Sequence, residues 1–422
     1  MHIQTMEQAS DVLRSGLRRL DLAGARVLLI VPDGTRTAPV PWFFREIRSE
    51  LQDRVEALDV MVALGTHQPM GDDALATHLG VPSVSTVPSV STVPSVSSGR
   101  VPGAVRVLGH VWDDRAALAE LGAIPRGEIR RISGGRLDEE LVVTINRAAL
   151  EYDRLLILSP VFPHELVGIS GGYKYLFPGI SGPEIINLTH WLAALTGNLA
   201  SIGRLSTPAR DVIHAAAGLV PVPASAICTV ITKQGIDGIY VGEVLDAWSS
   251  AASHSQAAHI EQKPHQYRSV LACAPRMYDD LWTGGKAIYK CEPVVEPGGE
   301  LIVYAPHITS PSVTHADHLL RCGYHCIDYF VDRLDELAEV PRMILGVASY
   351  VYGNGTWANG VETPRMRVKL ATGIAPEVCR RLGLEYIDPD SIDPAAWQDR
   401  EDEGKLYVEK AGETLYRLAG DV

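Results

Sequence analysis

The sequence has no uninterrupted apolar stretch long enough to cross a membrane. Its first residues, MHIQTMEQASDVLRSGLRRLDL, follow an amphipathic helix pattern and lack the apolar segment of a signal peptide. Positive charge is also scarce, because 38 Lys and Arg stand against 51 Asp and Glu, which gives a net charge of −13. These shortages predict a soluble, cytoplasmic protein with neither a nucleic-acid nor a membrane partner.

Cysteine is sparse as well. Six cysteines are scattered over 422 residues, which is typical of reduced thiols rather than of a disulfide framework. Only Cys322 and Cys326, in the segment CGYHC, come close together. No second pair completes the four ligands of a structural zinc site, so ordinary packing is favoured. The HExxH motif of zinc hydrolases is also absent.

Short apolar runs rich in Val, Ile and Leu indicate buried strands. They are ARVLLIV (25–31), ALDVMVAL (57–64), DRLLILSP (153–160), LACA (271–274) and GELIVYA (299–305). Helix-like patterns lie between them, which predicts an α/β fold with mainly parallel sheets. The length exceeds that of one ordinary core and predicts two domains, 1–262 and 263–422, with a hinge in the polar segment 254–266.

A six-residue repeat occupies residues 81–98, which read VPSVST, VPSVST and VPSVSS. Pro recurs at every sixth position and no large apolar face is present, so neither a helix nor a central strand is expected. The repeat therefore predicts a flexible insertion in a surface loop, with no chemical role.

Two segments place polar groups directly after predicted strands. In VPDGTRTAP (31–39) these groups are Asp33, Thr35 and Arg36, and the Arg side chain offers a planar fork for a carboxylate or phosphate. Turn chemistry explains the same residues equally well. In ALGTHQPM (63–70), His67 follows a strand and could act as a general acid/base or cap a helix.

The richest segment is LSPVFPHELVGISGGYKYLFPGISGPEIINLTHW (158–191). His164 follows a strand, and a turn of small residues leads to Lys174. Lys174 could bind phosphate, form a Schiff base, anchor a cofactor or simply lie at the surface. The turn lacks the frames of a Walker loop and of GxGxxG, but its backbone could approach an anion closely. The groups expected to do so are Ser170, Gly171 and Gly172.

His190, near the end of this segment, could bind a metal or pack beside Trp191. Three histidines, one Lys and one Arg are thus expected at strand ends or in turns rather than within helices. That distribution is typical of a functional site.

In the order DGTRTAP, GTHQP and PHELVGISGGYKYLFPGISG followed by Thr189-His190, these motifs resemble the lactate racemase family of nickel-pincer-dependent hydroxyacid racemases and epimerases. The resemblance spans roughly residues 20 to 310. It implies an isomerase that acts on a 2-hydroxyacid by hydride transfer to and from a cofactor, through a 2-oxoacid. It also implies an active site in the cleft between the domains.

The resemblance further implies a role for each matching residue. Lys174 would carry a covalently attached pyridinium mononucleotide with two sulfur arms, the nickel-pincer nucleotide, and His190 would bind its nickel. His67 and His164 would be the acid/base pair. Asp33 and Thr35 would contact the cofactor together with the turn 170–172, and Arg36 would bind substrate. Cofactor-assembly enzymes would be transient partners.

In YDDLWTGGKAIYKCEPVVEPGG (278–299), Lys286 matches a family lysine that meets the substrate. Trp282 and Thr283, which would line the substrate site, stand where many relatives have Tyr and Gln, and this departure leaves the identity of the hydroxyacid open. Epimerisation of a larger sugar acid is the nearest alternative. A protein that only binds a nucleotide or phosphate is another, although it would leave His67 and His164 unexplained.

Overall fold

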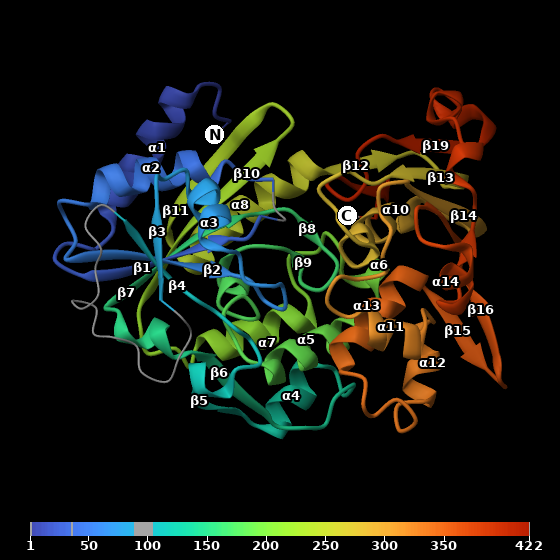
Figure 1. Ribbon diagram of the computed structural model, residues 1–422, viewed down its shortest axis with the longest axis horizontal. Coiled ribbons are helices and arrows are strands. Elements are labelled where there is room, and N and C mark those ends of the chain that lie inside the picture. The colour runs from blue at the N-terminus through green and yellow to red at the C-terminus, as the bar shows by residue number, and fades with distance from the viewer. Residues whose placement is uncertain (1, 35–36, 88–103, 422) are drawn as a thin grey trace. The chain divides into compact units, whose positions relative to one another are not determined.

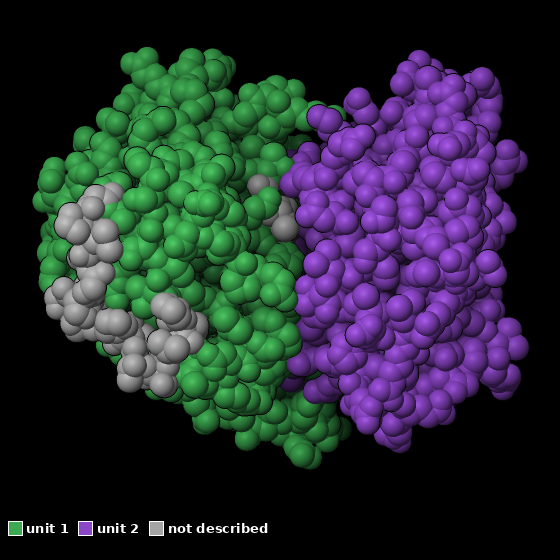
Figure 2. All heavy atoms as spheres, viewed as in Figure 1, with its two compact units in different colours: residues 1–162, 170–186, 210–258 green, residues 163–169, 187–209, 259–422 purple. Residues whose placement is uncertain are grey.

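The computed structural model describes residues 2–34, 37–87 and 104–421. These residues form two compact units, distinguished by colour in Figure 2. Unit 1 comprises residues 1–162, 170–186 and 210–258, and unit 2 comprises 163–169, 187–209 and 259–422. Within the described ranges, no helix is both long enough and apolar enough to cross a membrane.

Unit 1 is built on a seven-stranded sheet in the order β11-β10-β7-β1-β2-β4-β3 (Figure 1). All neighbouring strands are parallel except the antiparallel hairpin of β10 and β11. The strands are β1 (Arg26–Pro32), β2 (Ala57–Ala63), β3 (Val84–Val87), β4 (Val105–Leu108), β7 (Arg154–Pro160), β10 (Ala224–Thr232) and β11 (Gly235–Glu243). A separate antiparallel pair consists of β5 (Leu118–Ile124) and β6 (Leu141–Asn146).

Helices accompany the strands of unit 1. They are α1 (Met6–Arg19), α2 (Val40–Leu51), α3 (Asp72–Leu79), α4 (Arg126–Ile132) and α8 (Val244–His259), whose last residue belongs to unit 2. Two further helices span both units: α5 (Pro183–Thr196) and α7 (Pro208–Ala217). Short 3-10 helices are η1 (Arg115–Ala117), η2 (Arg147–Glu151) and η3 (Gly172–Tyr175).

Unit 2 contains a five-stranded, fully parallel sheet in the order β18-β17-β14-β13-β19. Its strands are β13 (Tyr267–Cys273), β14 (Val295–Ala305), β17 (Arg367–Thr372), β18 (Glu385–Tyr386) and β19 (Lys405–Val408). Three small pairs accompany it: β8 (Pro163–His164) with β9 (Gly168–Ile169), β12 (Ile260–Lys263) with β20 (Leu415–Leu418), and β15 (Gly355–Ala358) with β16 (Val361–Pro364).

The helices of unit 2 are mostly short. They are α6 (Asn198–Ser201), α9 (Leu281–Gly284), α10 (Lys286–Cys291), α11 (Ala316–Cys322), α12 (Ile327–Asp332), α13 (Arg342–Tyr352) and α14 (Pro376–Arg381). The 3-10 helices are η4 (Glu292–Val294), η5 (Pro389–Ser391), η6 (Pro394–Trp397) and η7 (Glu401–Glu403). Parallel strands joined by helices confirm the predicted α/β class.

The core of unit 1 forms where α1 and α2 bury apolar stripes against the sheet. Leu13 and Leu17 are fully buried and lie one helical turn apart on α1, as an amphipathic helix requires. Gly16 lies on the same helix, and a Cβ there would come within 2.5 Å of Val241 in β11. The absence of a side chain at Gly16 therefore lets α1 approach the sheet closely.

All five predicted strands are present, but the prediction for the repeat was wrong in part. Residues 84–87 form β3, the edge strand of the large sheet, with Val84 and Val87 partly buried. Pro82 lies just before this strand, where its missing N–H group interrupts little pairing. The rest of the repeat, 88–98, lies outside the described residues.

The predicted hinge 254–266 contains the end of α8 and the strand β12, so it is not an extended linker. The predicted domain division after residue 262 remains a prediction, and unit 2 also takes up two earlier segments of the chain. All six cysteines are free, and Cys322 and Cys326 are buried.

Replacing Leu29 by Ala should lower the free energy of unfolding of unit 1 by about 2–5 kcal/mol, because a fully buried side chain of the central strand would leave a cavity. Leu245→Ala, in α8, is the matched control, because Leu245 is 47% exposed and its loss should change stability by no more than about 0.5 kcal/mol. Urea denaturation of the two variants checks this. Equal losses would contradict the placement of β1 in the core.

Candidate functional site

Three loops of unit 1 meet at one edge of the sheet because β7, β1 and β2 are adjacent and parallel. After β1 the chain passes to β2 on one side, whereas β7 and β10 lie on the other. The neighbourhood of β1 and β7 is therefore the point where strand order reverses, and α/β sheets place ligands outside the carboxyl ends of strands at such points. Asp33 follows β1, His67 follows β2, and the glycine-rich turn follows β7.

Asp33 and His67 form a hydrogen-bonded pair between the carboxylate Oδ2 and the imidazole Nδ1. The Asp33 side chain is 9% exposed and that of His67 is 30% exposed. A buried carboxylate at Nδ1 fixes the orientation of the ring, so that Nε2 can face a reacting group. This arrangement suits a general acid/base. Thr35 and Arg36, predicted to act from the same loop, lie outside the described residues.

The loop that carries His67 is joined to the segment that follows Lys174. The Gly65 N–H donates to the Gly179 carbonyl at 2.9 Å, and the Gly179 N–H donates to the Lys174 carbonyl at 3.1 Å. Two hydrogen bonds thus connect the main chain of the His67 loop to that of Lys174. The predicted acid/base residue and the predicted attachment lysine therefore belong to one connected set of loops.

Ser170 organises the glycine-rich turn through both functions of its hydroxyl group. Its Oγ donates to the Pro160 carbonyl at 3.1 Å and accepts from the Phe162 N–H at 3.1 Å. The side chain is nearly fully buried. The hydroxyl proton is thus used within the protein, and Ser170 fixes the path of the loop after β7. Its predicted contact with a cofactor remains a prediction.

Gly171 and Gly172 adopt conformations that L-residues avoid, with φ of +92° and +60°. A Cβ on Gly171 would lie 2.7 Å from the Val161 side chain, and one on Gly172 would lie 3.1 Å from Trp248. The turn is therefore restricted to glycine by conformation and by space. It leads directly into η3, in which Lys174 is partly buried.

A buried cluster supports this turn from α7 and α8. The Trp248 indole N–H donates to the Ser170 carbonyl at 2.8 Å, and the Arg210 guanidinium lies 4.0 Å from the centroid of the Trp248 ring. Burial lowers the pKa of Arg210 to about 9. Burial, aided by the charge of Arg210, lowers the pKa of His214 to about 4, so this imidazole is neutral at neutral pH.

Sequence reasoning missed this cluster. The signal available was the spacing of Arg210 and His214, four positions apart in PARDVIHAAA, which places both side chains on one face of α7. The third member, Trp248, lies more than thirty residues later on another helix, and nothing local in the sequence connects it with the glycine-rich turn.

His164 belongs to unit 2, where it ends the short strand β8. Its side chain is 5% exposed, and its Nδ1 accepts from the Leu166 N–H at 3.2 Å and lies 3.4 Å from the Glu165 carboxylate. Gly168 in the partner strand β9 has a φ of +75°, and a Cβ there would come within 2.0 Å of the Arg204 carbonyl oxygen. The tight β8–β9 pair therefore holds His164 in a fixed place.

The expected position of His190 was wrong. His190 lies inside α5, not at a strand end or in a turn, because the run PEIINLTHWLAALT continues as a helix to Thr196. Its side chain is partly buried, whereas the adjacent Trp191 is 3% exposed. The backbone at Gly346 packs against the His190 carbonyl, which a Cβ would approach to 2.9 Å. A helix-borne imidazole of this kind remains able to bind a metal.

The three predicted substrate residues of the C-terminal segment lie together in unit 2, around α9 and α10. Asp280 caps α9 by accepting from the Thr283 N–H at 2.9 Å, and the Thr283 hydroxyl also donates to the Asp280 carboxylate at 2.7 Å. The Trp282 ring lies 4.7 Å from the His315 ring, and the Lys286 ammonium lies 5.1 Å from the centre of the Tyr278 ring. Their contacts with substrate remain predictions.

His110, in the segment GHVWDD, is a structural histidine. It is 2% exposed, and the Asn146 side-chain amide lies 3.2 Å from its Nδ1. Burial lowers the pKa of His110 to about 4, so the ring is neutral at neutral pH.

Replacing Gly171 by Ala should destabilise unit 1 by about 1–3 kcal/mol, because the backbone conformation is strained for L-residues and the new Cβ would overlap Val161. Gly242→Ala is the matched control, since a Cβ on this glycine of β11 would meet no atom within 4 Å and its φ is not positive. Thermal and urea unfolding of both variants measure the difference. A Gly171→Ala protein as stable as the control would refute the turn geometry.

Comparison with known proteins finds similarity to lactate racemases. The family model of the lactate racemase N-terminal domain matches residues 7–202. Lactate racemase of Lactiplantibacillus plantarum is 24% identical over 221 residues, 50% of this chain and 44% of its own length. Lactate racemase of Thermoanaerobacterium thermosaccharolyticum is 26% identical over 257 residues, 58% of this chain and 49% of its own. The chain thus spans about half the length of these curated relatives.

Two solved structures share the fold over nearly the whole chain. A crystal structure of a Thermotoga maritima protein has a TM-score of 0.87 at 26% identity and covers 99% of this chain and 100% of its own. The lactate racemase apoprotein of T. thermosaccharolyticum has a TM-score of 0.69 at 15% identity, with 97% and 92% covered, which shows a common fold. Residues 7–202 therefore match the lactate racemase N-terminal domain, and about half of the chain is similar to the lactate racemases.

Proposed function

We propose that this protein is a racemase or epimerase of a 2-hydroxyacid that works with a nickel-pincer nucleotide held by Lys174. The observation that carries the proposal is the junction of two loops at the carboxyl edge of one sheet. There the Asp33–His67 pair is linked through Gly65 and Gly179 to the Lys174 turn. The relationship to lactate racemases supports the same reaction class.

The residues fit such a cofactor in their chemistry. Lys174 is a primary amine, partly exposed at the end of a glycine-only turn, where a covalent link to a carboxyl-type or thioacid arm can form. His190 supplies an imidazole, a good ligand for nickel. When bound, the cofactor would supply reversible hydride chemistry at C2 of the substrate, by way of a 2-oxoacid.

The protein's own contribution is proton transfer and positioning. His67 would take the hydroxyl proton from one enantiomer, because Asp33 holds its Nδ1 and stabilises the imidazolium that forms. His164 would do the same for the other enantiomer, with the Glu165 carboxylate near its ring. A reaction that starts from either enantiomer needs one such group for each.

The substrate carboxylate would be neutralised by the cationic side chains of Arg36 and Lys286. Trp282 and Thr283 would contact the rest of the substrate. The Thr283 hydroxyl already donates to Asp280, which leaves it less able to bind a polar substituent. The specific hydroxyacid therefore stays open between a small acid and a larger sugar acid, for which the enzyme would be an epimerase.

A protein that only binds a phosphate is less well supported. In that alternative the turn 170–172 would offer its hydroxyl and N–H groups to the anion. However, the Ser170 hydroxyl donates to Pro160 and the Gly172 N–H donates to Ser159, so two of the expected donors are used internally. The Asp33–His67 pair would also have no purpose.

The cofactor proposal predicts a covalent mass increase on the peptide that contains Lys174. The protein should be produced together with the cofactor-assembly enzymes and nickel, and its intact and peptide masses measured. Lys174→Ala should lose the added mass, whereas Lys233→Ala should retain it, because Lys233 is exposed in the β10–β11 hairpin. Absence of added mass, under conditions that load an L. plantarum lactate racemase, would refute covalent attachment.

The acid/base proposal predicts that His67→Asn and His164→Asn each slow racemisation by at least about 100-fold, while the added mass on Lys174 is retained. Chiral chromatography of a panel of 2-hydroxyacids measures both directions and identifies the substrate. His265→Asn is the control, since His265 is exposed and outside the predicted site. Turnover at the wild-type rate by either loaded variant would overturn its role.

A further inference from the structure

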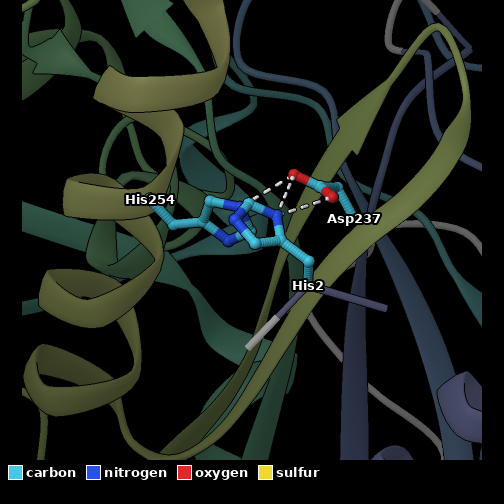
Figure 3. A group of neighbouring side chains, drawn as sticks. All are labelled: His2, Asp237 and His254. Carbon is cyan, nitrogen blue, oxygen red and sulfur yellow. Dashed lines mark hydrogen bonds and ion pairs between the residues drawn. The ribbon is translucent and has the colours of Figure 1, made fainter. Parts of the chain in front are cut away.

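A second histidine cluster lies in unit 1, apart from the loops described above. It consists of His2, Asp237 and His254, shown in Figure 3. His2 precedes α1, Asp237 lies near the start of β11, and His254 lies on α8. Two strands, β10 and β7, separate β11 from β1 in the sheet, so the cluster is distinct from the Asp33–His67 pair.

The three side chains converge on one point. The His2 Nδ1 lies 3.0 Å from Asp237 Oδ1, and the His254 Nε2 lies 2.8 Å from Asp237 Oδ2. All three ligand atoms lie within 4.8 Å of one another. A tetrahedral zinc ion with bonds of about 2.0–2.2 Å separates its ligands by about 3.3–3.5 Å, so small movements would admit it. The two imidazole planes meet at 87°, which lets both nitrogens face the carboxylate.

The surroundings of His254 are also those of a metal-binding histidine. Its second ring nitrogen, Nδ1, is 3.0 Å from the Tyr240 hydroxyl, which would fix the ring and its tautomer. Gly238 provides the space for the ring, because a Cβ there would lie 2.6 Å from Nδ1. The side chains of His254 and Asp237 are 8% and 21% exposed, so two of the three ligands are held in place.

His2 completes the set from the surface. Its side chain is 73% exposed, and the neighbouring Ile3 N–H donates to the Asp237 carbonyl at 2.9 Å. That backbone hydrogen bond holds the segment before α1 against the β10–β11 hairpin and brings His2 to Asp237. The exposed side leaves room for a water molecule as a fourth ligand.

We propose that His2, Asp237 and His254 bind a divalent transition metal of the zinc type, which ties the segment before α1 to β11 and α8. Two imidazoles and one carboxylate suit zinc, whereas magnesium prefers oxygen ligands alone. The ion would bind the folded unit in preference to the unfolded chain and so stabilise it. This inference is independent of the proposed function, because it involves neither Lys174 nor His190.

Calorimetric titration of Zn²⁺ into the metal-free chain, made without a histidine tag and without the cofactor-assembly enzymes, tests the proposal. We expect one high-affinity equivalent per chain that excess Mg²⁺ does not displace. His254→Ala and Asp237→Asn should each weaken this binding by at least about tenfold, and His2→Ala should do the same. His265→Ala and His190→Ala should keep it.

Two further measurements guard against loss of folding. Circular dichroism should show the variants folded, and Zn²⁺ should raise the melting temperature of the wild type and of His265→Ala but not of Asp237→Asn. Co²⁺ bound at the site should give the visible absorption of a four- or five-coordinate ion. A wild-type chain that binds no more Zn²⁺ than Asp237→Asn would overturn the proposal, as would unchanged affinity in His2→Ala.

Discussion

The parallel register of β7, β1 and β2 is the constraint on which the candidate site depends. Val27 of β1 lies opposite Leu58 of β2 and Arg154 of β7, so the three strands end at the same edge. Side chains that are more than a hundred residues apart in sequence therefore reach neighbouring loops. A shift of β1 by one residue relative to its neighbours would move Asp33 away from His67. It would also turn fully buried side chains such as Leu29 to the opposite face of the sheet.

The glycine-rich turn meets two demands at once. On the solvent side it must present Lys174, and on the protein side it must lie flat against the β7 strand end and Trp248. Only glycine, which has no Cβ, allows this close packing at positions 171 and 172. The Ser170 hydroxyl also holds the turn, because it donates one hydrogen bond to the backbone and accepts another from it. The turn is thus rigid before any ligand arrives, which reduces the cost of ordering it on binding.

The sequence predicted those parts of the fold that depend on local pattern. Apolar runs identified β1, β2, β7, β13 and β14, because a strand buried on both faces has a continuous apolar signature. The edge strand β3 was not predicted, because the Pro residues of the repeat dominate the local sequence pattern. Parallel pairing with β4, which the local pattern does not record, stabilises this strand. The position of His190 within a helix was not predicted either, because the segment just before α5 is rich in glycine and proline. The Arg210–Trp248 contact is a matter of tertiary packing, which no local pattern records.

The two residues of the proposed acid/base pair belong to different units, His67 to unit 1 and His164 to unit 2, and the path of the chain explains why. Phe162 and Ser170 belong to unit 1, yet the seven residues between them, including His164, belong to unit 2. Hydrogen bonds between Phe162 and Ser170 close the base of this excursion, at 2.8 Å and 3.1 Å. The same loop therefore carries Lys174 on one unit and His164 on the other, only ten positions apart. Within unit 1, Lys174 is held relative to His67 through the hydrogen bonds of Gly65 and Gly179, because both loops belong to that unit.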